Sequence, residues 1–534
     1  MPSMIRMLRL ALPILLIGAL LTPTAAQASE TQFSIMMDDD LLVYRDNQTR
    51  DNAMRRMKTL GADVVRVTVL WSVLTDGLEG HPTTKKGKAK LAANKRRYAR
   101  WGEASPLAYP PLNWNRYDGI ARACKTLGLV CYFDVTGPGP SWSHGKPPPQ
   151  YAKDAKWWKP KPRNFYNFVR AVGRRYSGKF RDNDEGKGLL PPVHMWSLWN
   201  EPNQGGWLRP QWLNGKAVSP SLYRSLYLFG YNALLREGHG NDIILAGETA
   251  PINVARQTTT SAMGPKTFIN ELLCGPGSNG LGCSEFDKKG PIKAWGWAHH
   301  PYTKNNSPLQ RDADPQAITL ANFNELGDQL DQLSATGHIA PGMRLLSTEF
   351  GYETNPPDPF ATTTLQQQAQ YLAIGDYLTS SNPRVAGHTQ FLLRDVPPNK
   401  RYSPGSRNYW GTYQSGLYGA TGTPKPAEKA YSFPFFAVPA SADPETGART
   451  LSVWGQLRFR ANGALTPETP EYAYIQWRPD GNTAWTIVQS LPVTQAYGYF
   501  RADGVVVPGP GQLRAAWVGG QLPYSADTLV QDIP

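Results

Sequence analysis

The sequence predicts an α/β fold, a (β/α)8 TIM barrel, followed by a small all-β sandwich of immunoglobulin or fibronectin type. Over residues 33–435, eight short apolar runs alternate with amphipathic stretches, which is the pattern of eight strand-and-helix units. Residues 436–534 contain neither Lys nor Cys and alternate short strand patterns with turn clusters, as β-sandwiches do. We therefore expect one large domain over residues 29–435 and an accessory domain over residues 436–534.

The composition is that of a folded protein. The chain has 534 residues, of which 40% are hydrophobic and 18% charged, so it is neither disordered nor of low complexity. Its length exceeds what one hydrophobic core usually organises. The formal net charge is +14. An excess of this sign is found in proteins that bind nucleic acid, acidic membranes or acidic substrates, and also in proteins with a plain basic surface.

Residues 1–28 have the pattern of an export signal. Arg6 and Arg9 form a basic segment, residues 10–21 are apolar, and the small-x-small triplet at residues 26–28 forms a cleavage site. An uncleaved membrane anchor is the alternative, but the apolar run is shorter than the roughly 20 residues that cross a bilayer. We therefore expect a secreted protein without a membrane span.

The barrel elements follow in order after the signal. Helical patterns over residues 52–60, 117–127 and 165–176 are each closed by a glycine, which commonly ends a helix. Later helices are predicted at residues 221–236, 317–333, 365–378 and 426–431. The eight strands are predicted at residues 33–37, 64–71, 130–135, 193–199, 243–247, 294–299, 344–350 and 387–393.

The accessory domain is predicted from five alternating runs separated by turns such as residues 479–482 and 508–511. Trp454, Trp477 and Trp517 are its expected core residues. Acidic residues outnumber arginines from residue 440 onward, so the positive excess of the chain belongs to the barrel. The five runs are residues 451–460, 473–478, 485–490, 497–502 and 512–518.

The four cysteines fall into two local pairs, Cys124 with Cys131 and Cys274 with Cys283. An even number in an exported chain favours disulfides, although three pairings are open. The pair Cys274 and Cys283 brackets a segment rich in Gly, Ser and Asn, which suits a closed surface loop. A zinc site would need tighter spacing and nearby His, so we expect disulfides and no metal.

Two glutamates stand where apolar strands end. Glu201 lies at the end of the fourth predicted strand and Glu349 at the end of the seventh, and barrel active sites lie at the C-terminal ends of the strands. An acid flanked by Trp and Phe has a raised pKa unless neighbours compensate. Two such acids facing one another can divide the work, because one protonates a leaving oxygen while the other attacks the anomeric carbon of a sugar.

These segments resemble the catalytic segments of clan A glycoside hydrolases, closest to families 5 and 39. The likeness rests on Trp199-Asn200-Glu201-Pro202 at strand four and Thr348-Glu349-Phe350-Gly351 at strand seven, and it spans the whole barrel. It implies that Glu201 is the acid/base and Glu349 the nucleophile. It also implies that Asn200, the residue before the acid/base, holds the 2-hydroxyl of the sugar.

Other positions of the resemblance lie on neighbouring strands. His300-Pro301-Tyr302 matches a His-x-Tyr segment on strand six whose Tyr orients the nucleophile, and Arg66 matches an Arg inside strand two. Strand three carries Asp134 where a His is common, and strand eight ends without the Trp that floors the sugar subsite in many members. The stacking residue is then expected from Trp410 or Tyr413.

Each candidate also has a structural interpretation. The two glutamates could form ion pairs with Arg66, which interrupts a Val-rich strand and must therefore have an acidic partner; we expect that partner to be Glu349. His300 and Tyr302 could be hydrogen-bonded core residues, and His299 is expected to be structural because it faces the other side of its strand. Aromatic residues on strand-end loops can stack on sugar rings or pack in the loop core; these are Trp71, Trp142, Trp207 and Trp410.

The positive charge is concentrated in one segment of the sequence. Residues 85–100 contain eight Lys and Arg and no acid, in the long insertion after strand two. Such a patch could attract a polyanion or the carboxylates of an acidic sugar, but we expect a solvated, mobile loop. Nucleic acid is not expected, because the run lacks a known binding motif.

The sequence thus predicts a secreted retaining glycosidase that cleaves O-glycosidic bonds of an oligo- or polysaccharide. No cofactor is expected, because protonation and nucleophilic attack account for the chemistry. The expected partner is a carbohydrate, with an acidic sugar as one option, and the expected state is a monomer. The alternative is a catalytically inactive carbohydrate-binding or cell-surface protein on a barrel scaffold. The sandwich is either a sugar-binding module or a packing partner.

Overall fold

The structure is a computed structural model that describes residues 31–533 except for the segments 184–187, 279–282, 284–289, 461–469 and 519–524. The expected export signal, residues 1–28, lies outside this part. Among the described residues, no helix is both long and apolar enough to cross a membrane.

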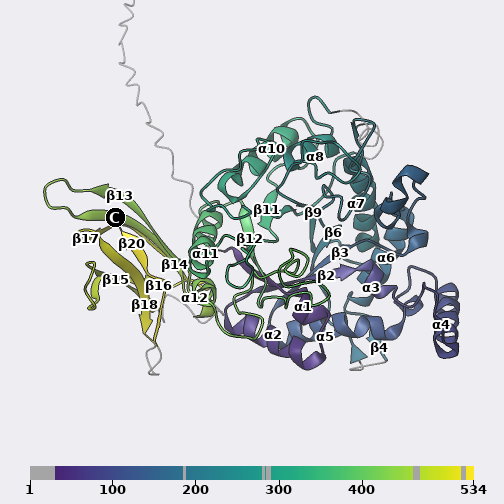
Figure 1. Cartoon of the computed structure of the whole chain (residues 1–534), viewed down its shortest axis with the longest axis horizontal. Coiled ribbons are helices and arrows are strands. Elements are labelled where there is room, and N and C mark those ends of the chain that lie inside the picture. Colours follow the sequence, from purple (N-terminus) through teal and green to yellow (C-terminus); the bar gives the residue numbers. More distant parts are fainter. Residues whose placement is uncertain are drawn as a thin grey trace, which may run out of the picture.

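Eight parallel strands close into a barrel (Figure 1), which confirms the predicted fold. The strands follow one another around the barrel in chain order, as expected when each strand returns through a right-handed crossover. Every strand overlaps its predicted run. The strands are β1 (Phe33–Met37), β2 (Val64–Leu70), β3 (Val130–Thr136), β6 (Met195–Leu198), β9 (Ile243–Thr249), β10 (Gly296–His299), β11 (Arg344–Ser347) and β12 (Val385–Phe391).

Helices surround the barrel (Figure 1). Gly128 ends α5 with φ 61°, a left-handed conformation that glycine adopts without strain. The α-helices are α1 (Asp39–Val43), α2 (Asn47–Thr59), α3 (Trp71–Leu74), α4 (Lys85–Trp101), α5 (Pro111–Leu127), α6 (Pro162–Arg175), α7 (Ser219–Arg236), α8 (Pro265–Leu272), α10 (Asn324–Ala335), α11 (Leu365–Ser380) and α12 (Pro426–Ser432). Short elements are η1 (Pro106–Ala108), η2 (Ser141–Ser143), η3 (Pro149–Trp157), η4 (Leu320–Asn322), β4 (Arg181–Asp182), β5 (Gly188–Leu189), β7 (Trp212–Leu213) and β8 (Lys216–Ala217).

The barrel interior is layered. An apolar cluster that includes Val64 of β2 and Tyr132 of β3 fills one layer. Because strand side chains alternate between the two faces, the next inward residues are Arg66 and Asp134, both with no exposed surface. A polar layer therefore lies between the apolar base of the barrel and the C-terminal strand ends.

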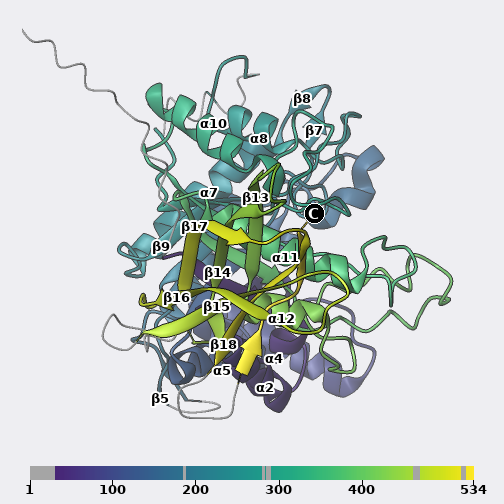
Figure 2. The same ribbon diagram turned by 90° about the vertical axis from the view of Figure 1, so that its left-hand side faces the viewer.

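The C-terminal part forms two antiparallel sheets beside the barrel (Figure 2), as predicted. The first strand begins at Phe435 and was absent from the predicted set. Trp517 is buried in the core between the sheets, whereas Trp454 packs against Tyr377 of α11. The strands are β13 (Phe435–Ala442), β14 (Arg449–Gln456), β15 (Glu471–Arg478), β16 (Thr486–Val493), β17 (Tyr499–Val507), β18 (Gly511–Val518), β19 (Ser525–Asp527) and β20 (Gln531–Ile533).

A buried ion pair joins the sandwich to the barrel. Arg458 lies in η5 (Arg458–Arg460), where a strand end was predicted. Its Nη2 donates to Oδ1 of Asp376 in α11 at 2.7 Å, and its Nη1 donates to the carbonyl of Tyr431 at 2.7 Å. Both partners of the ion pair are nearly inaccessible to water, with side chains 3% and 8% exposed.

The variant Arg458→Ala is expected to destabilise the protein by about 3–5 kcal/mol, because it leaves a buried carboxylate without its partner. The matched control is Arg460→Ala, which removes a half-exposed partner of Glu471 and should cost roughly 1 kcal/mol or less. Differential scanning calorimetry of both variants measures the difference. Equal shifts of the two unfolding midpoints would show that the buried pair adds nothing to the docking of the sandwich.

The basic run at residues 85–100 is a helix and not the expected loop. It forms most of α4 and contains no buried residue. Thr84 caps the helix by accepting a hydrogen bond from the Gly87 backbone N–H, which stabilises the first turn. The cysteines form the two local disulfides, Cys124–Cys131 and Cys274–Cys283.

Candidate active site

The two glutamates lie at the C-terminal ends of their strands, and the loop that carries Glu201 has a strained backbone. Glu201 follows β6 with φ 38°, and Trp199 just before it has φ 77°. Positive φ costs a non-glycine residue about 1–3 kcal/mol and is concentrated at functional sites. The turn is held by hydrogen bonds from the Trp199 N–H to the Val135 carbonyl and from the Glu201 N–H to the Glu248 carbonyl.

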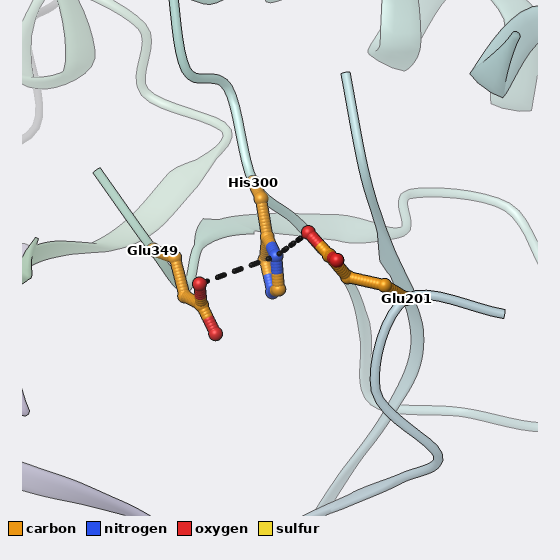
Figure 3. Close-up of side chains that lie close together, drawn as sticks. All are labelled: Glu201, His300 and Glu349. Carbon is orange, nitrogen blue, oxygen red and sulfur yellow. Dashed lines mark hydrogen bonds and ion pairs between the residues drawn. The ribbon is translucent and has the colours of Figure 1, made fainter. Parts of the chain in front are cut away.

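Glu201 and Glu349 face one another across His300 (Figure 3). One carboxylate oxygen of each lies within 4.8 Å of the other and of a His300 ring nitrogen. Nδ1 of His300 is 3.0 Å from Oε1 of Glu201 and 3.6 Å from Oε2 of Glu349. The structure therefore brings together residues from three strand ends.

Arg66 organises the floor of the site. Its Nη1 donates to Oε1 of Glu349 at 2.9 Å. Its Nη2 is 3.0 Å from Oε2 of Glu248 and 3.1 Å from Oδ1 of Asn200. Because Asn200 accepts from Arg66 through Oδ1, its amide NH₂ is the group left to donate to a ligand.

His300 is a cation at neutral pH. Burial opposes its charge, but the charge of Glu349 and hydrogen bonds with Glu201 and Glu248 outweigh burial and raise the pKa of His300 to about 10. Both ring nitrogens therefore carry protons, and each can donate to a carboxylate. The site thus places two buried cations, Arg66 and His300, among several carboxylates.

Tyr302 contacts the second oxygen of Glu349. Its hydroxyl donates to Oε2 at 3.1 Å. Burial raises the pKa of Tyr302 well above its usual value, and the charge of Glu349 adds to the effect, so the phenol stays protonated and remains a donor. Glu349 therefore has a fixed donor on each oxygen, Arg66 on one and Tyr302 on the other.

Glu248 is a member of the site that the sequence interpretation missed. It is fully buried in β9 and contacts Arg66, His300 at 2.7 Å, Thr348 at 2.8 Å and Tyr132. Burial opposes its ionisation, but the charge of Arg66 and the hydrogen bond from His300 hold its pKa well below the usual range. Glu248 is thus the permanent anion that balances the two cations.

A β-bulge explains why strand periodicity hides Glu248. Leu245 faces the barrel interior, so strict alternation would point Glu248 outward. The pairing of β9 with β10 shifts register here, from Gly247 opposite Ala298 to Thr249 opposite His299. The extra residue, Glu248, is turned inward at φ 49°. An acid directly after the apolar run 243–247 was the available signal.

A cavity of about 730 Å³ opens over the pair, and both Glu201 and Glu349 line it. Asn200, Tyr302 and Trp207 also line it. Phe391 at the end of β12 lies edge-on to Tyr413, with 5.1 Å between the ring centroids. These two rings form an aromatic wall at strand eight. Of the two residues expected to stack on a sugar there, Trp410 and Tyr413, it is Tyr413 that lines the cavity.

Several sequence candidates lie outside this cavity. Trp71 is in the core and stacks on Phe168 at 5.0 Å. Trp142 donates to Glu103 at 3.3 Å, and Trp410 donates to the Pro404 carbonyl at 3.0 Å; neither lines the cavity.

Two further residues, the candidate Asp134 and His299, which is expected to be structural, are buried. Asp134 is fully buried, 3.4 Å from Arg66, and accepts from Ser197 at 3.1 Å. His299 is buried against Thr249 and the Ile318 carbonyl, as its position on the opposite strand face indicates. Asp134 supports the site through Arg66, and neither residue lines the cavity.

Glu201, His300 and Glu349 offer three atoms at metal-ligand spacing among the described residues. A metal binds neutral imidazole through a nitrogen lone pair. Both ring nitrogens of His300 already face carboxylates, Nδ1 toward Glu201 at 3.0 Å and Nε2 toward Glu248 at 2.7 Å. The ring is thus engaged in hydrogen bonds with Glu201 and Glu248, and 3.6 Å separates it from Glu349.

No protein-family model matches the sequence, and no curated protein matches it. Among solved structures, the chain is similar to a family 39 glycoside hydrolase from Bacteroides cellulosilyticus, with a TM-score of 0.44, 11% identity, and coverage of 89% of this chain and 79% of that chain.

Two other solved structures are similar to the chain. One is a GH39 β-xylosidase from Caulobacter crescentus, with a TM-score of 0.45, 14% identity, and coverage of 85% and 84%. The other is GH5_18 from Streptomyces cattleya in complex with GlcNAc, with a TM-score of 0.46, 13% identity, and coverage of 76% and 80%. In both cases the first coverage refers to this chain.

Proposed function

We propose that the protein is a retaining glycoside hydrolase that cleaves O-glycosidic bonds with Glu349 as nucleophile and Glu201 as acid/base. The observation that carries this proposal is the separation of the two carboxylates, whose oxygens approach within 4.8 Å. Retaining glycosidases place their carboxyl groups about 5–5.5 Å apart, whereas inverting enzymes need about 6.5–9.5 Å to admit a water molecule. The strained backbone at Glu201 and the cavity above the pair also support it.

The surroundings of the two carboxylates differ, and this difference supports the proposed roles. Arg66 and Tyr302 hold both oxygens of Glu349, which fixes the carboxylate and stabilises its charge, as a nucleophile requires. Among the described residues, the side-chain hydrogen bond of Glu201 is at Oε1, to His300, and its side chain is 16% exposed. The second oxygen of Glu201 is therefore available to carry a proton to a substrate in the cavity.

The reaction has two steps. In the first, a Glu349 oxygen bonds to the anomeric carbon while the bond to the leaving oxygen breaks, and that oxygen takes the proton of Glu201. In the second, Glu201 takes a proton from water, the water oxygen bonds to the anomeric carbon, and the ester bond to Glu349 breaks. Two inversions at one carbon retain its configuration. Asn200 donates to a sugar hydroxyl, and Trp207 offers a stacking surface for the ring.

The charges that line the cavity favour an uncharged or cationic sugar over an acidic one. Burial raises the pKa of Asp39 to about 6 and that of Glu353 to about 7. The surroundings of the cavity therefore already oppose the ionisation of carboxyl groups. The lining cation is Lys304, and it is paired with Asp312 at 3.0 Å. A uronate carboxylate would add a further negative charge against Glu201 and Glu349.

We further propose that the protein is exported and acts as a monomer, with residues 1–28 as its signal, residues 29–435 as the catalytic domain and residues 436–534 as an accessory domain. The two disulfides support an oxidising destination.

A panel of 4-nitrophenyl hexosides, pentosides, amino sugar glycosides and uronides tests the function. We expect at least one uncharged or amino sugar glycoside to be hydrolysed, and each matching uronide to react at least tenfold more slowly. Proton NMR of the first product is expected to show the anomer of the substrate. Inversion would contradict the roles given to the two glutamates, and an inert panel, extended to polysaccharides, would favour a binding protein on a barrel scaffold.

A further inference from the structure

Helix α4 presents positive charge on every side except one. Four half-buried residues, Gly87, Leu91, Asn94 and Tyr98, recur at helical spacing and face the protein. Asn94 donates to the Gly77 carbonyl at 3.0 Å, and Tyr98 packs edge-on against Trp142. The other residues of the helix are exposed, and eight of them are cations: Lys85, Lys86, Lys88, Lys90, Lys95, Arg96, Arg97 and Arg100.

This charge distribution differs from that of an ordinary solvated helix. None of the eight cations forms an ion pair within the part of the chain that the structure describes. Pairs such as Lys86 with Lys90 and Arg96 with Arg100 stand four residues apart, where like charges repel. Surface helices usually alternate the two signs. The helix therefore keeps an unfavourable charge pattern that a bound anion would relieve.

A second basic segment, residues 146–163, adjoins α4. Lys161 donates to the Trp142 carbonyl at 2.8 Å, and the Trp142 ring contacts Tyr98 of α4. Glu103, just after α4, accepts from Asn164 of α6 at 2.8 Å. In Figure 1, α4 and α6 lie on the same side of the barrel. The exposed cations of this segment are Lys146, Lys153, Lys156, Lys159, Lys161 and Arg163.

We propose that these two sets of cations, here named the basic surface, bind a linear polysaccharide that carries carboxylates. A helix of 17 residues is about 26 Å long, so it can meet several successive charged units. Trp101, at the end of α4, is 46% exposed beside Arg100 and offers a face for a sugar ring. No cation of the basic surface lines the cavity of Glu201 and Glu349, so the surface is a docking site separate from the proposed reaction.

Two other polyanions fit less well. A membrane-binding helix places a row of bulky apolar residues outward, but in α4 the only such residue that is exposed is Trp101, at the helix end, while Leu91 and Tyr98 face the protein. Nucleic acids are mainly intracellular, whereas the disulfides indicate an oxidising environment. An acidic polysaccharide agrees with both observations. It needs only exposed cations for binding, and it is abundant outside cells.

The test compares two variants of the full chain with the same loss of charge. The first replaces Lys88, Lys90, Arg96 and Arg97 of α4 by Gln, which is a good helix former. The control replaces four exposed cations elsewhere on the barrel by Gln: Lys179, Arg236, Lys293 and Arg344. Affinities for polygalacturonate, neutral dextran, anionic phospholipid vesicles and oligothymidine are measured over a range of salt concentrations, and thermal unfolding checks that both variants fold.

We expect the unmodified protein to bind polygalacturonate in preference to the other three probes and to lose affinity as salt rises. The α4 variant should lose at least tenfold in affinity and show a shallower salt dependence, while the control should lose less than threefold. Equal losses in the two variants, no binding of polygalacturonate, or stronger binding of vesicles or oligothymidine would each overturn the proposal. Since binding is measured without turnover, the result is independent of the proposed catalysis.

Discussion

Replacement of Glu349 by Gln is expected to lower kcat on an activated aryl glycoside by a factor on the order of 10⁴ to 10⁶. The amide keeps the size of the carboxylate but has no charge with which to attack the anomeric carbon. It can also accept through only one atom, so either Arg66 or Tyr302 faces an NH₂ group in place of an oxygen. Initial rates of 4-nitrophenol release from the best substrate of the panel measure the loss.

The matched control is Glu445→Gln, the same chemical change at an exposed residue of the sandwich. Its kcat should stay within about twofold of the unmodified protein. Thermal unfolding of both variants separates a chemical loss from a folding defect, because Glu349→Gln also changes a buried network. A folded Glu349→Gln variant that keeps more than a tenth of the activity would show that Glu349 is not the nucleophile.

Placement at strand ends made two members of the site predictable from sequence. Glu201 and Glu349 are single acids directly after apolar runs, and barrel topology brings such positions to one rim. Glu248 follows the run 243–247 in the same way, but the apolar pattern predicts that the strand ends at Gly247. The strand continues through Gly247, whose φ is 105°, and only the bulge turns Glu248 inward. A bulge depends on pairing between strands and leaves no periodic signal in one of them.

The fold was predictable for a related reason. Buried parallel strands form near-continuous apolar runs, so all eight barrel strands stand out from the chain even where one residue such as Arg66 is polar. Helix α4 does not, because its protein-facing stripe contains Gly87 and Asn94 and only two large apolar residues, Leu91 and Tyr98. Aromatic side chains on loops are the least predictable, since Trp207 and Trp410 are similar in sequence context and only Trp207 lines the cavity.

Replacement of Glu201 by Ala is expected to lower kcat/KM about 10²- to 10⁴-fold on a substrate with a poor leaving group. The loss should be much smaller on an activated aryl glycoside, because 4-nitrophenolate leaves without protonation. Glu349 still attacks in this variant, so a glycosyl ester forms and then accumulates. A burst of 4-nitrophenol equal to the enzyme concentration, followed by slow turnover, is therefore the expected time course.

Added azide distinguishes an acid/base role of Glu201 from a purely structural role. The alanine leaves space beside the ester, and azide needs no base to attack the anomeric carbon, so it should restore the steady rate. Its nitrogen bonds to that carbon as the bond to Glu349 breaks, which gives a glycosyl azide with the configuration of the substrate. If Glu201 only held His300 in place, azide would restore nothing, and both leaving-group classes would lose rate equally. A glycosyl azide of inverted configuration would instead mean direct attack without the ester, and Glu349 would lose its role.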